Sequence, residues 1–297
     1  YEVRRLIQNV EVVKLGEVVE EKGVQLEFAN AGHIPGSMMT IVHGKNKSLV
    51  FTGDVNTIDT NLVKGASFNS IKAEYLILEA TYADATHPPR AEVERKFINA
   101  IKEVLDNKGI VLVPAFALGR SQEILCVLKK YGIVPVFYDG MVREINRVLL
   151  SNLGSLNERT LFEDAVIAYN EVKGWYNRRH ILSRPCVIVA SAGMLKGGPA
   201  LYYLKRIYDD PRNAVFLVSF QAPNTPGYRL LSTGSWNEGR LKVKARIEWF
   251  DFSSHAGKHE LLSIVKNIKG LEKVIIVHSE LEPAIKLSEI IRDETGV

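Results

Sequence analysis

The sequence predicts an α/β protein in which one domain interrupts another. Residues 9–51 contain short apolar runs separated by turn residues, a pattern typical of β-strands. From about residue 90, apolar strands alternate with helical patterns, which indicates a parallel sheet with crossover helices. Five polar residues suited to chemistry lie outside this alternating part, on both sides of it. We therefore expect residues 85–240 to form a domain inserted into another, which is made of residues 1–84 and 241–297.

Apolar runs give the expected elements in order along the chain. In the first part we expect strands at Val10–Val13, Val24–Phe28, Met38–Val42, Ser48–Phe51 and Tyr75–Leu78. In the middle part the strands are predicted at Gly109–Pro114, Val134–Tyr138, Cys186–Ala190 and Ala214–Ser219. Helices are expected between them near residues 91–107, 120–131, 142–151, 158–170, 199–209 and 227–233. The last part shows strand character over Leu241–Phe250, a helix over Lys258–Asn267 and a strand over Val274–Val277.

The composition is that of a soluble globular protein and leaves several partners open. The 297 residues, 46% of them hydrophobic and 24% charged, allow one large domain or two ordinary ones. No run approaches the ~20 apolar residues of a membrane span, and the N-terminus has no signal-peptide pattern. A net charge of +4 permits a polyanionic partner without requiring one. Cys126 and Cys186 lie in apolar surroundings, so we expect buried free thiols in a reducing, cytoplasmic compartment.

The five polar residues all come at or just past the end of a predicted strand. They are His33, Asp54, Glu79, His255 and His278. Each one alone has an ordinary explanation, such as a loop histidine or a turn aspartate. Strand ends at the rim of a sheet are nevertheless where ligands and acid/base groups converge from distant parts of a chain. Three histidines with two carboxylates therefore favour metal-assisted hydrolysis.

Two glycine-containing turns in the middle part follow strands and open helices. They cover residues 115–121 and 191–199. Backbone N–H groups at a helix start attract anions, and Arg120 and Lys196 add formal charge. Ordinary strand-to-helix turns explain both segments equally well by themselves. Beside a site that hydrolyses a phosphodiester, they become candidate phosphate contacts, namely Arg120, Ser121, Ser191, Gly193 and Lys196.

The order of these segments resembles a known family. The segments are Ala31-Gly32-His33, Thr52-Gly53-Asp54, Glu79-Ala80-Thr81-Tyr82, Phe116-Ala117-Leu118-Gly119-Arg120, Ser191-Ala192-Gly193-Met194, Phe252-Ser253-Ser254-His255 and Val277-His278-Ser279-Glu280. Over about residues 25–290 they resemble the β-CASP branch of the metallo-β-lactamase superfamily. The chain looks most like archaeal homologues of the cleavage and polyadenylation specificity factor endonuclease. The resemblance implies a metallo-β-lactamase αββα sandwich, with its N-terminal part missing here, interrupted by an α/β parallel-sheet β-CASP domain.

The resemblance also implies a role for each of the five residues. His33 and His278 match zinc ligands, and Asp54 matches the catalytic aspartate that bridges two zinc ions. Glu79 matches the acidic residue that pairs with His255, the general acid for the leaving group. A histidine at the position of His278 is typical of the RNA-processing members. We therefore expect a zinc-dependent ribonuclease acting on single-stranded RNA, with two zinc ions and a homodimer in the complete protein.

Three departures from the family pattern limit this expectation. Ser279 replaces the glycine usual after the last histidine, and Gly257 stands where the family often has aspartate. The hallmark His-x-His-x-Asp-His segment is absent from the 297 residues and is expected upstream. We therefore expect this chain by itself to carry part of the metal site and to be inactive. A non-catalytic RNA-binding or scaffold subunit is the alternative, while the large insertion disfavours a small-molecule metallohydrolase.

Overall fold

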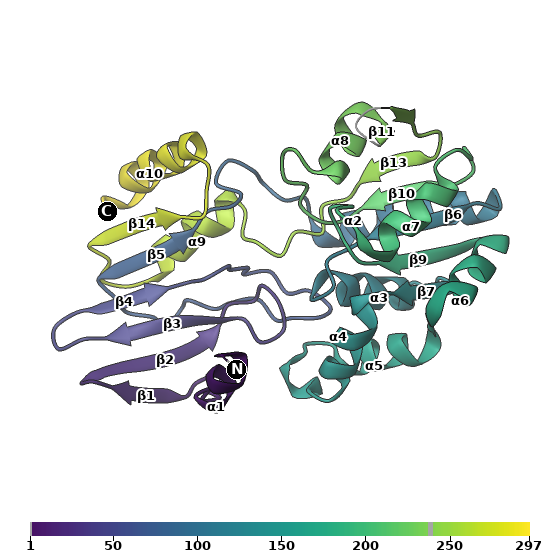
Figure 1. The fold of residues 1–297 in the computed structure, drawn as a ribbon. Coiled ribbons are helices and arrows are strands. Elements are labelled where there is room, and N and C mark those ends of the chain that lie inside the picture. Colours follow the sequence, from purple (N-terminus) through teal and green to yellow (C-terminus); the bar gives the residue numbers. More distant parts are fainter. Residues whose placement is uncertain (1, 237–239) are drawn as a thin grey trace. The chain divides into compact units, whose positions relative to one another are not determined.

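The structure, a computed structural model, describes residues 2–236 and 240–297 and divides into two compact units (Figure 1). The first unit comprises Tyr1–Ile58, Gly65–Thr86 and His255–Val297, and the second comprises Asp59–Lys64 and His87–Ser254. The predicted α/β class with a parallel sheet is confirmed. Within the described residues, no helix is both long and apolar enough to span a membrane.

The first unit is built on a mixed six-stranded sheet. Its strand order is β1 (Val18–Glu21), β2 (Val24–Asn30), β3 (Met38–His43), β4 (Ser48–Phe51), β5 (Tyr75–Glu79) and β14 (Lys273–Val277). β1 to β4 pair antiparallel, as turn-connected strands do, whereas β4, β5 and β14 are parallel. Val277 pairs with Glu79, so two distant segments of the chain end their strands side by side.

Only one face of this sheet forms the core of the first unit. Leu76 and Leu78 of β5 are fully buried, because they pack with the apolar sides of α9 (Lys258–Asn267) and α10 (Leu281–Thr295). The opposite face keeps large apolar side chains accessible, with Phe51 45% and Ile275 43% exposed. α1 (Glu2–Gln8) lies at the N-terminal end of this unit.

The second unit is built on a six-stranded parallel sheet. Its order is β13 (Arg246–Trp249), β10 (Ala214–Leu217), β6 (Ile110–Pro114), β9 (Cys186–Ala190), β7 (Val136–Asp139) and β8 (Asn170–Glu171). β6 and β9 are buried at every position, as expected for central strands covered on both faces. A small antiparallel pair, β11 (Ser235–Trp236) and β12 (Leu241–Lys242), accompanies this sheet.

Helices cover both faces of the parallel sheet (Figure 1). The core on one face includes residues of α2 (Arg90–Asp106) and α3 (Arg120–Lys130). The other face packs against α7 (Gly198–Ile207) and α8 (Pro226–Thr233). The remaining helices of this unit in the described residues are α4 (Met141–Leu150), α5 (Arg159–Ala168), α6 (Gly174–His180), η1 (Leu153–Ser155) and η2 (Ile181–Ser183).

The two ends of the second unit are tied to each other. His87 Nδ1 lies 2.7 Å from Asp251 Oδ2, with both side chains about nine-tenths buried. Arg90 donates a hydrogen bond of 2.6 Å to the carbonyl oxygen of Ser253, and its guanidinium lies 5.3 Å from the ring centre of Phe252. The main segment of this unit, residues 87–254, therefore begins and ends at one place.

Several sequence expectations need correction. Val10–Val13 forms no strand, and β1 at Val18–Glu21 takes the edge position instead. The run Leu241–Phe250 divides into β12 and β13, and β13 pairs with β10 of the second unit. Residues 241–254 thus pack with the second unit, although the sequence placed them with the C-terminal part.

The cysteine prediction is confirmed. Cys126 and Cys186 are buried free thiols. Burial raises the pKa of Cys186 to about 12, so this thiol stays protonated and unreactive at neutral pH.

Candidate metal centre

A buried carboxylate at the end of β5 anchors the candidate site. Glu79 is 1% exposed and accepts four hydrogen bonds. The backbone N–H of Val55 and the Nδ1–H of His255 reach Oε1 at 3.0 and 2.7 Å. The backbone N–H and the hydroxyl of Thr81 reach Oε2 at 2.9 and 2.7 Å. Every lone-pair direction of this carboxylate is thus directed at a donor, which offsets the cost of burying it.

These contacts fix the protonation of the Glu79–His255 pair. Burial opposes ionisation of Glu79, but the hydrogen bond from His255 and those from Thr81 and Val55 hold its pKa below the usual range. An ionised carboxylate only accepts hydrogen bonds, so the proton between the two residues sits on His255 Nδ1. Nε2 is then the nitrogen of His255 that carries its chemistry.

The segment of His255 is held in place by the backbone around it. The N–H of Ala256 donates to the carbonyl oxygen of Val55 at 2.7 Å, and Gly257 forms a parallel bridge with Tyr82. The ring of Tyr82 lies 6.1 Å from that of His255. The pairing of His255 with Glu79 therefore rests on fixed backbone as well as on side-chain contacts.

Asp54 lies between two histidines and presents a different oxygen to each. His33 Nε2 is 3.7 Å from Oδ2, and His278 Nδ1 is 3.3 Å from Oδ1. The ring centre of His255 lies 4.5 Å from that of His33 and 6.0 Å from that of His278. Four of the five predicted residues thus surround one point of the first unit, and Glu79 supports them from beneath.

The turn that carries His33 can form only with glycine before it. Gly32 has φ +73°, and a Cβ there would lie 2.1 Å from the carbonyl oxygen of Asn56. The hydroxyl of Ser37 accepts hydrogen bonds of 3.2 Å from the N–H groups of His33 and Ile34. This side-chain capping holds the turn open toward Asp54.

His278 lies just after β14 in a left-handed backbone conformation. Its φ of 53° is uncommon for a residue other than glycine and is estimated to cost about 1–2 kcal/mol. The Thr81 oxygen lies 3.1 Å from His278 Nδ1 while its hydroxyl donates to Glu79. The Thr81 oxygen therefore accepts a hydrogen bond from Nδ1–H of His278, and Nε2 of that ring is then the nitrogen that would bind a metal ion. Thr81 is not among the residues predicted from the sequence, although its position two residues after Glu79 is a usable signal.

The donor set suits zinc, which takes imidazole nitrogen and carboxylate oxygen. Ligand atoms lie within 4.8 Å of one another in two groups, His33–Asp54–His255 and Glu79–His255–His278. The predicted ligands His33, Asp54 and His278 do not form one such group by themselves. Asp54 instead lies between His33 and His278 and presents one carboxylate oxygen to each.

The predicted phosphate contacts all lie in the second unit, near the carboxyl ends of β6 and β9. Arg120 is 9% exposed and donates to Ser254 Oγ at 2.9 Å. Ser121 is fully buried and donates to the carbonyl oxygen of Phe116. A Cβ on Gly193 would lie 3.0 Å from the backbone nitrogen of Phe116, so the two turns meet. The contacts of Arg120 and Ser121 favour a structural role for both, whereas Lys196 is exposed.

Ser191 occupies the start of the second turn. Its side chain is 8% exposed, and its carbonyl oxygen accepts from the N–H of Ala200 at 3.0 Å. Its role and that of Gly193 stay predictions.

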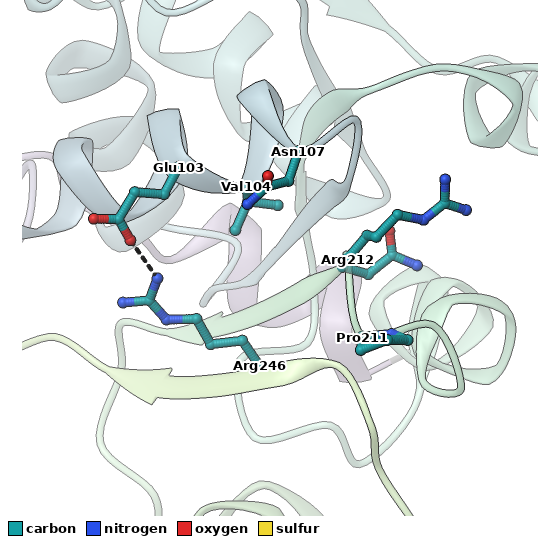
Figure 2. Close-up of a pocket in the computed structure, with 7 residues that line it drawn as sticks. Glu103, Val104, Asn107, Pro211, Arg212 and Arg246 are labelled. Atoms are coloured by element: carbon teal, nitrogen blue, oxygen red, sulfur yellow. Dashed lines mark hydrogen bonds and ion pairs between the residues drawn. The ribbon is translucent and has the colours of Figure 1, made fainter.

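A cavity of about 370 Å³ lies at the end of the second unit's parallel sheet that is opposite these turns (Figure 2). It is lined by Glu103, Val104, Asn107, Pro211, Arg212, Asn213 and Arg246. Arg246 pairs with Glu103 at 2.7 Å, and Arg212 pairs with Asp210 at 2.7 Å. Its arginines are thus neutralised within the unit, and it offers no ligand set of the kind around Asp54.

Comparison with known proteins identifies the family. Residues 121–230 match the Beta-Casp domain, and residues 240–297 match the Zn-dependent metallo-hydrolase RNA specificity domain. The chain is 36% identical to a probable RNase, MJ4, of Methanocaldococcus jannaschii over 94% of this chain and 68% of that protein. This chain is a β-CASP member of the metallo-β-lactamase superfamily. The resemblance predicted from the motifs is thereby confirmed.

Other relatives of this β-CASP protein carry two kinds of name. The chain is 46% identical over its whole length to RNase aCSPSF2 of Saccharolobus solfataricus and spans 61% of that protein. It is 32% identical to transcription termination factor FttA of Pyrococcus abyssi and spans 50% of it. The β-CASP chain thus covers about half to two thirds of the length of these relatives.

Proposed function

We propose that this β-CASP protein is a zinc-dependent ribonuclease that hydrolyses phosphodiester bonds of single-stranded RNA. One observation carries the proposal most directly. In one unit, Asp54 presents separate oxygens to His33 and His278 beside the buried pair Glu79–His255. The names of the relatives, two of them RNases, agree with the proposal.

The metal-holding part of the site would comprise His33, Asp54 and His278. Zinc, when bound, supplies Lewis-acid polarisation of a phosphoryl oxygen and a lower pKa for a water molecule. Asp54 would help to hold two ions, since its Oδ2 lies toward His33 and its Oδ1 toward His278. Thr81 fixes the tautomer of His278 and so presents Nε2 rather than Nδ1 as the ligand atom.

The proton-handling part of the site would comprise Glu79 and His255. The Glu79 carboxylate accepts from Nδ1 of His255 and stabilises the charged imidazolium. The proton on Nε2 is then available to the oxygen that leaves when the phosphodiester is cleaved. A buried, fully hydrogen-bonded Glu79 keeps the ring in one orientation throughout.

Substitution of the bridging aspartate tests the proposal. In the full-length protein, Asp54→Ala should abolish cleavage of a 5′-labelled single-stranded RNA and lower zinc content measured by elemental analysis. The matched control is Asp84→Ala, which removes an exposed carboxylate of the same unit. Undiminished cleavage by Asp54→Ala would refute the assignment.

The same assay separates the alternatives. If the unmodified full-length protein binds RNA but does not cleave it in the presence of zinc, the scaffold function is correct instead. Product lengths distinguish endonuclease from 5′–3′ exonuclease action. Homodimerisation and a cytoplasmic location stay predictions.

A further inference from the structure

A basic cavity in the second unit is separate from the metal ligands in sequence and in structure. Its volume is about 410 Å³, within the range of ligand pockets. Residues of α7, α8, β11, the turn after β9 and the loop before α8 line it, namely Leu195, Lys196, Leu201, Lys205, Asn224, Pro226, Arg229 and Trp236. All of them belong to the second unit.

Three cations converge on this cavity. Lys196, Lys205 and Arg229 are exposed and come from three different segments of the chain. Among the residues that the structure describes, no carboxylate lines the cavity and no ion pair joins any of the three cations to an acidic side chain. In this respect the cavity differs from that of Figure 2, whose arginines are both paired. Concentrated, uncompensated positive charge in a concave site attracts an anion.

An aromatic side chain lies beside these cations. Trp236 lines the cavity and is half-buried. Lys205 Nζ lies 5.6 Å from the centre of its ring, and Tyr208 packs near it with ring centres 6.3 Å apart. Basic side chains that follow a backbone, combined with an aromatic platform, are the usual means of binding a single strand without sequence preference.

We propose that this basic cavity is an accessory binding site for the phosphate backbone of single-stranded RNA. Lys205 and Arg229 contact successive phosphates, and Trp236 offers a surface to a base. The choice of RNA as ligand rests on the proposed ribonuclease function. The existence of the basic cavity depends only on the residues that line it, not on that function. An RNA site there lets the second unit hold a strand that is cleaved elsewhere.

Salt-dependent binding tests the proposal. We would measure the Kd of a fluorescein-labelled 15-nucleotide oligouridylate by anisotropy, using full-length Asp54→Ala protein so that the strand is not cut. Each phosphate contact to a single strand contributes ~0.7 to the slope of log K against log salt. Lys205→Ala/Arg229→Ala should therefore lower the slope by about 1.4 and weaken binding about 25-fold at ~0.1 M salt.

A matched double variant removes the general effect of charge. Lys102→Ala/Arg159→Ala deletes two exposed cations of the same unit that do not line the cavity. Equal weakening by both double variants, or an unchanged slope in the first, would overturn the accessory site. Equally tight binding of uridine monophosphate would also overturn it, because the cavity would then recognise a free nucleotide.

The binding measurement and the cleavage assay test the two proposals separately. Binding that depends on Lys205 and Arg229, together with no RNA cleavage by the full-length protein that retains Asp54, would refute the ribonuclease function alone. Cleavage that depends on Asp54, with no change in binding on loss of the two cations, would refute the accessory site alone.

Discussion

Replacement of Glu79 by glutamine removes one charge and one acceptor while it preserves shape. Each oxygen of the carboxylate accepts two hydrogen bonds, and one of the two donors at each oxygen is a backbone N–H. A glutamine side chain has a single acceptor oxygen and a donating NH₂ group. Whichever way the amide is turned, its NH₂ faces a backbone N–H, either that of Val55 or that of Thr81.

The expected loss follows from those contacts. One buried N–H without an acceptor costs about 1–3 kcal/mol. The remaining bonds lose their charge assistance, and charged hydrogen bonds are roughly twice as strong as neutral ones. We therefore expect Glu79→Gln to lower the free energy of opening of the first unit by about 2–4 kcal/mol.

Hydrogen exchange of the β5 and β14 amides measures this quantity in the first unit alone, which a melting curve of a two-unit protein does not. The measurement is made with metal chelated, so that lost zinc binding does not contribute. Glu272→Gln, which affects a half-exposed carboxylate paired with Lys47, serves as control and should change stability by less than ~0.5 kcal/mol. A similarly small change in Glu79→Gln would refute the hydrogen-bonding account of this site.

Three further substitutions test other parts of the structure. Gly32→Ala should unfold or displace the turn, because the added Cβ would overlap a backbone oxygen. Gly36→Ala is the control: its Cβ meets open space at a similar φ, so it should lower the free energy of thermal unfolding by only ~1 kcal/mol. His255→Ala should slow RNA cleavage while zinc content stays constant; loss of zinc would make that residue a ligand. Asp251→Asn should destabilise the protein at neutral pH, because the ionised carboxylate of Asp251 is stabilised in the folded state. Burial raises the pKa of Asp251, but the hydrogen bond from His87 outweighs this and holds the pKa below the usual range. The stability difference from wild type should therefore shrink as pH falls below the ordinary value of ~3.9 and through the folded-state pKa, and a constant difference would contradict this.

The residues of the candidate site were easier to predict from the sequence than the side-chain contacts that hold them in place. His33, Asp54, Glu79 and His255 were identifiable because turn glycines and strand ends mark them locally. Thr81 was not, since its role depends on His278, which arrives from a strand nearly two hundred residues later. A contact between side chains that are far apart in the sequence cannot be predicted from the residues that surround either of them.

The limits of local patterns also explain the other differences. A turn that opens a helix predicted a phosphate contact at Ser121, and its hydroxyl donates to a carbonyl of the preceding turn, a bond that the local pattern did not indicate. The apolar run Leu241–Phe250 indicated a strand without indicating its partner. Its pairing with β10 is set by burial in the second sheet, because strand pairing depends on tertiary context.

The ties between His87 and Asp251 and between Arg90 and Ser253 have a consequence for the order of folding. β5 and β14 must pair across the whole inserted segment, from residue 87 to residue 254. If the insertion folds first, these ties join its ends and shorten the connection between β5 and β14 from about 190 residues to about 30. Because each doubling of loop length costs about 0.6 kcal/mol of closure entropy, the shorter connection lowers that cost by roughly 1.6 kcal/mol. Glu79 and His255 are therefore brought together by a folding step that takes place in the other unit.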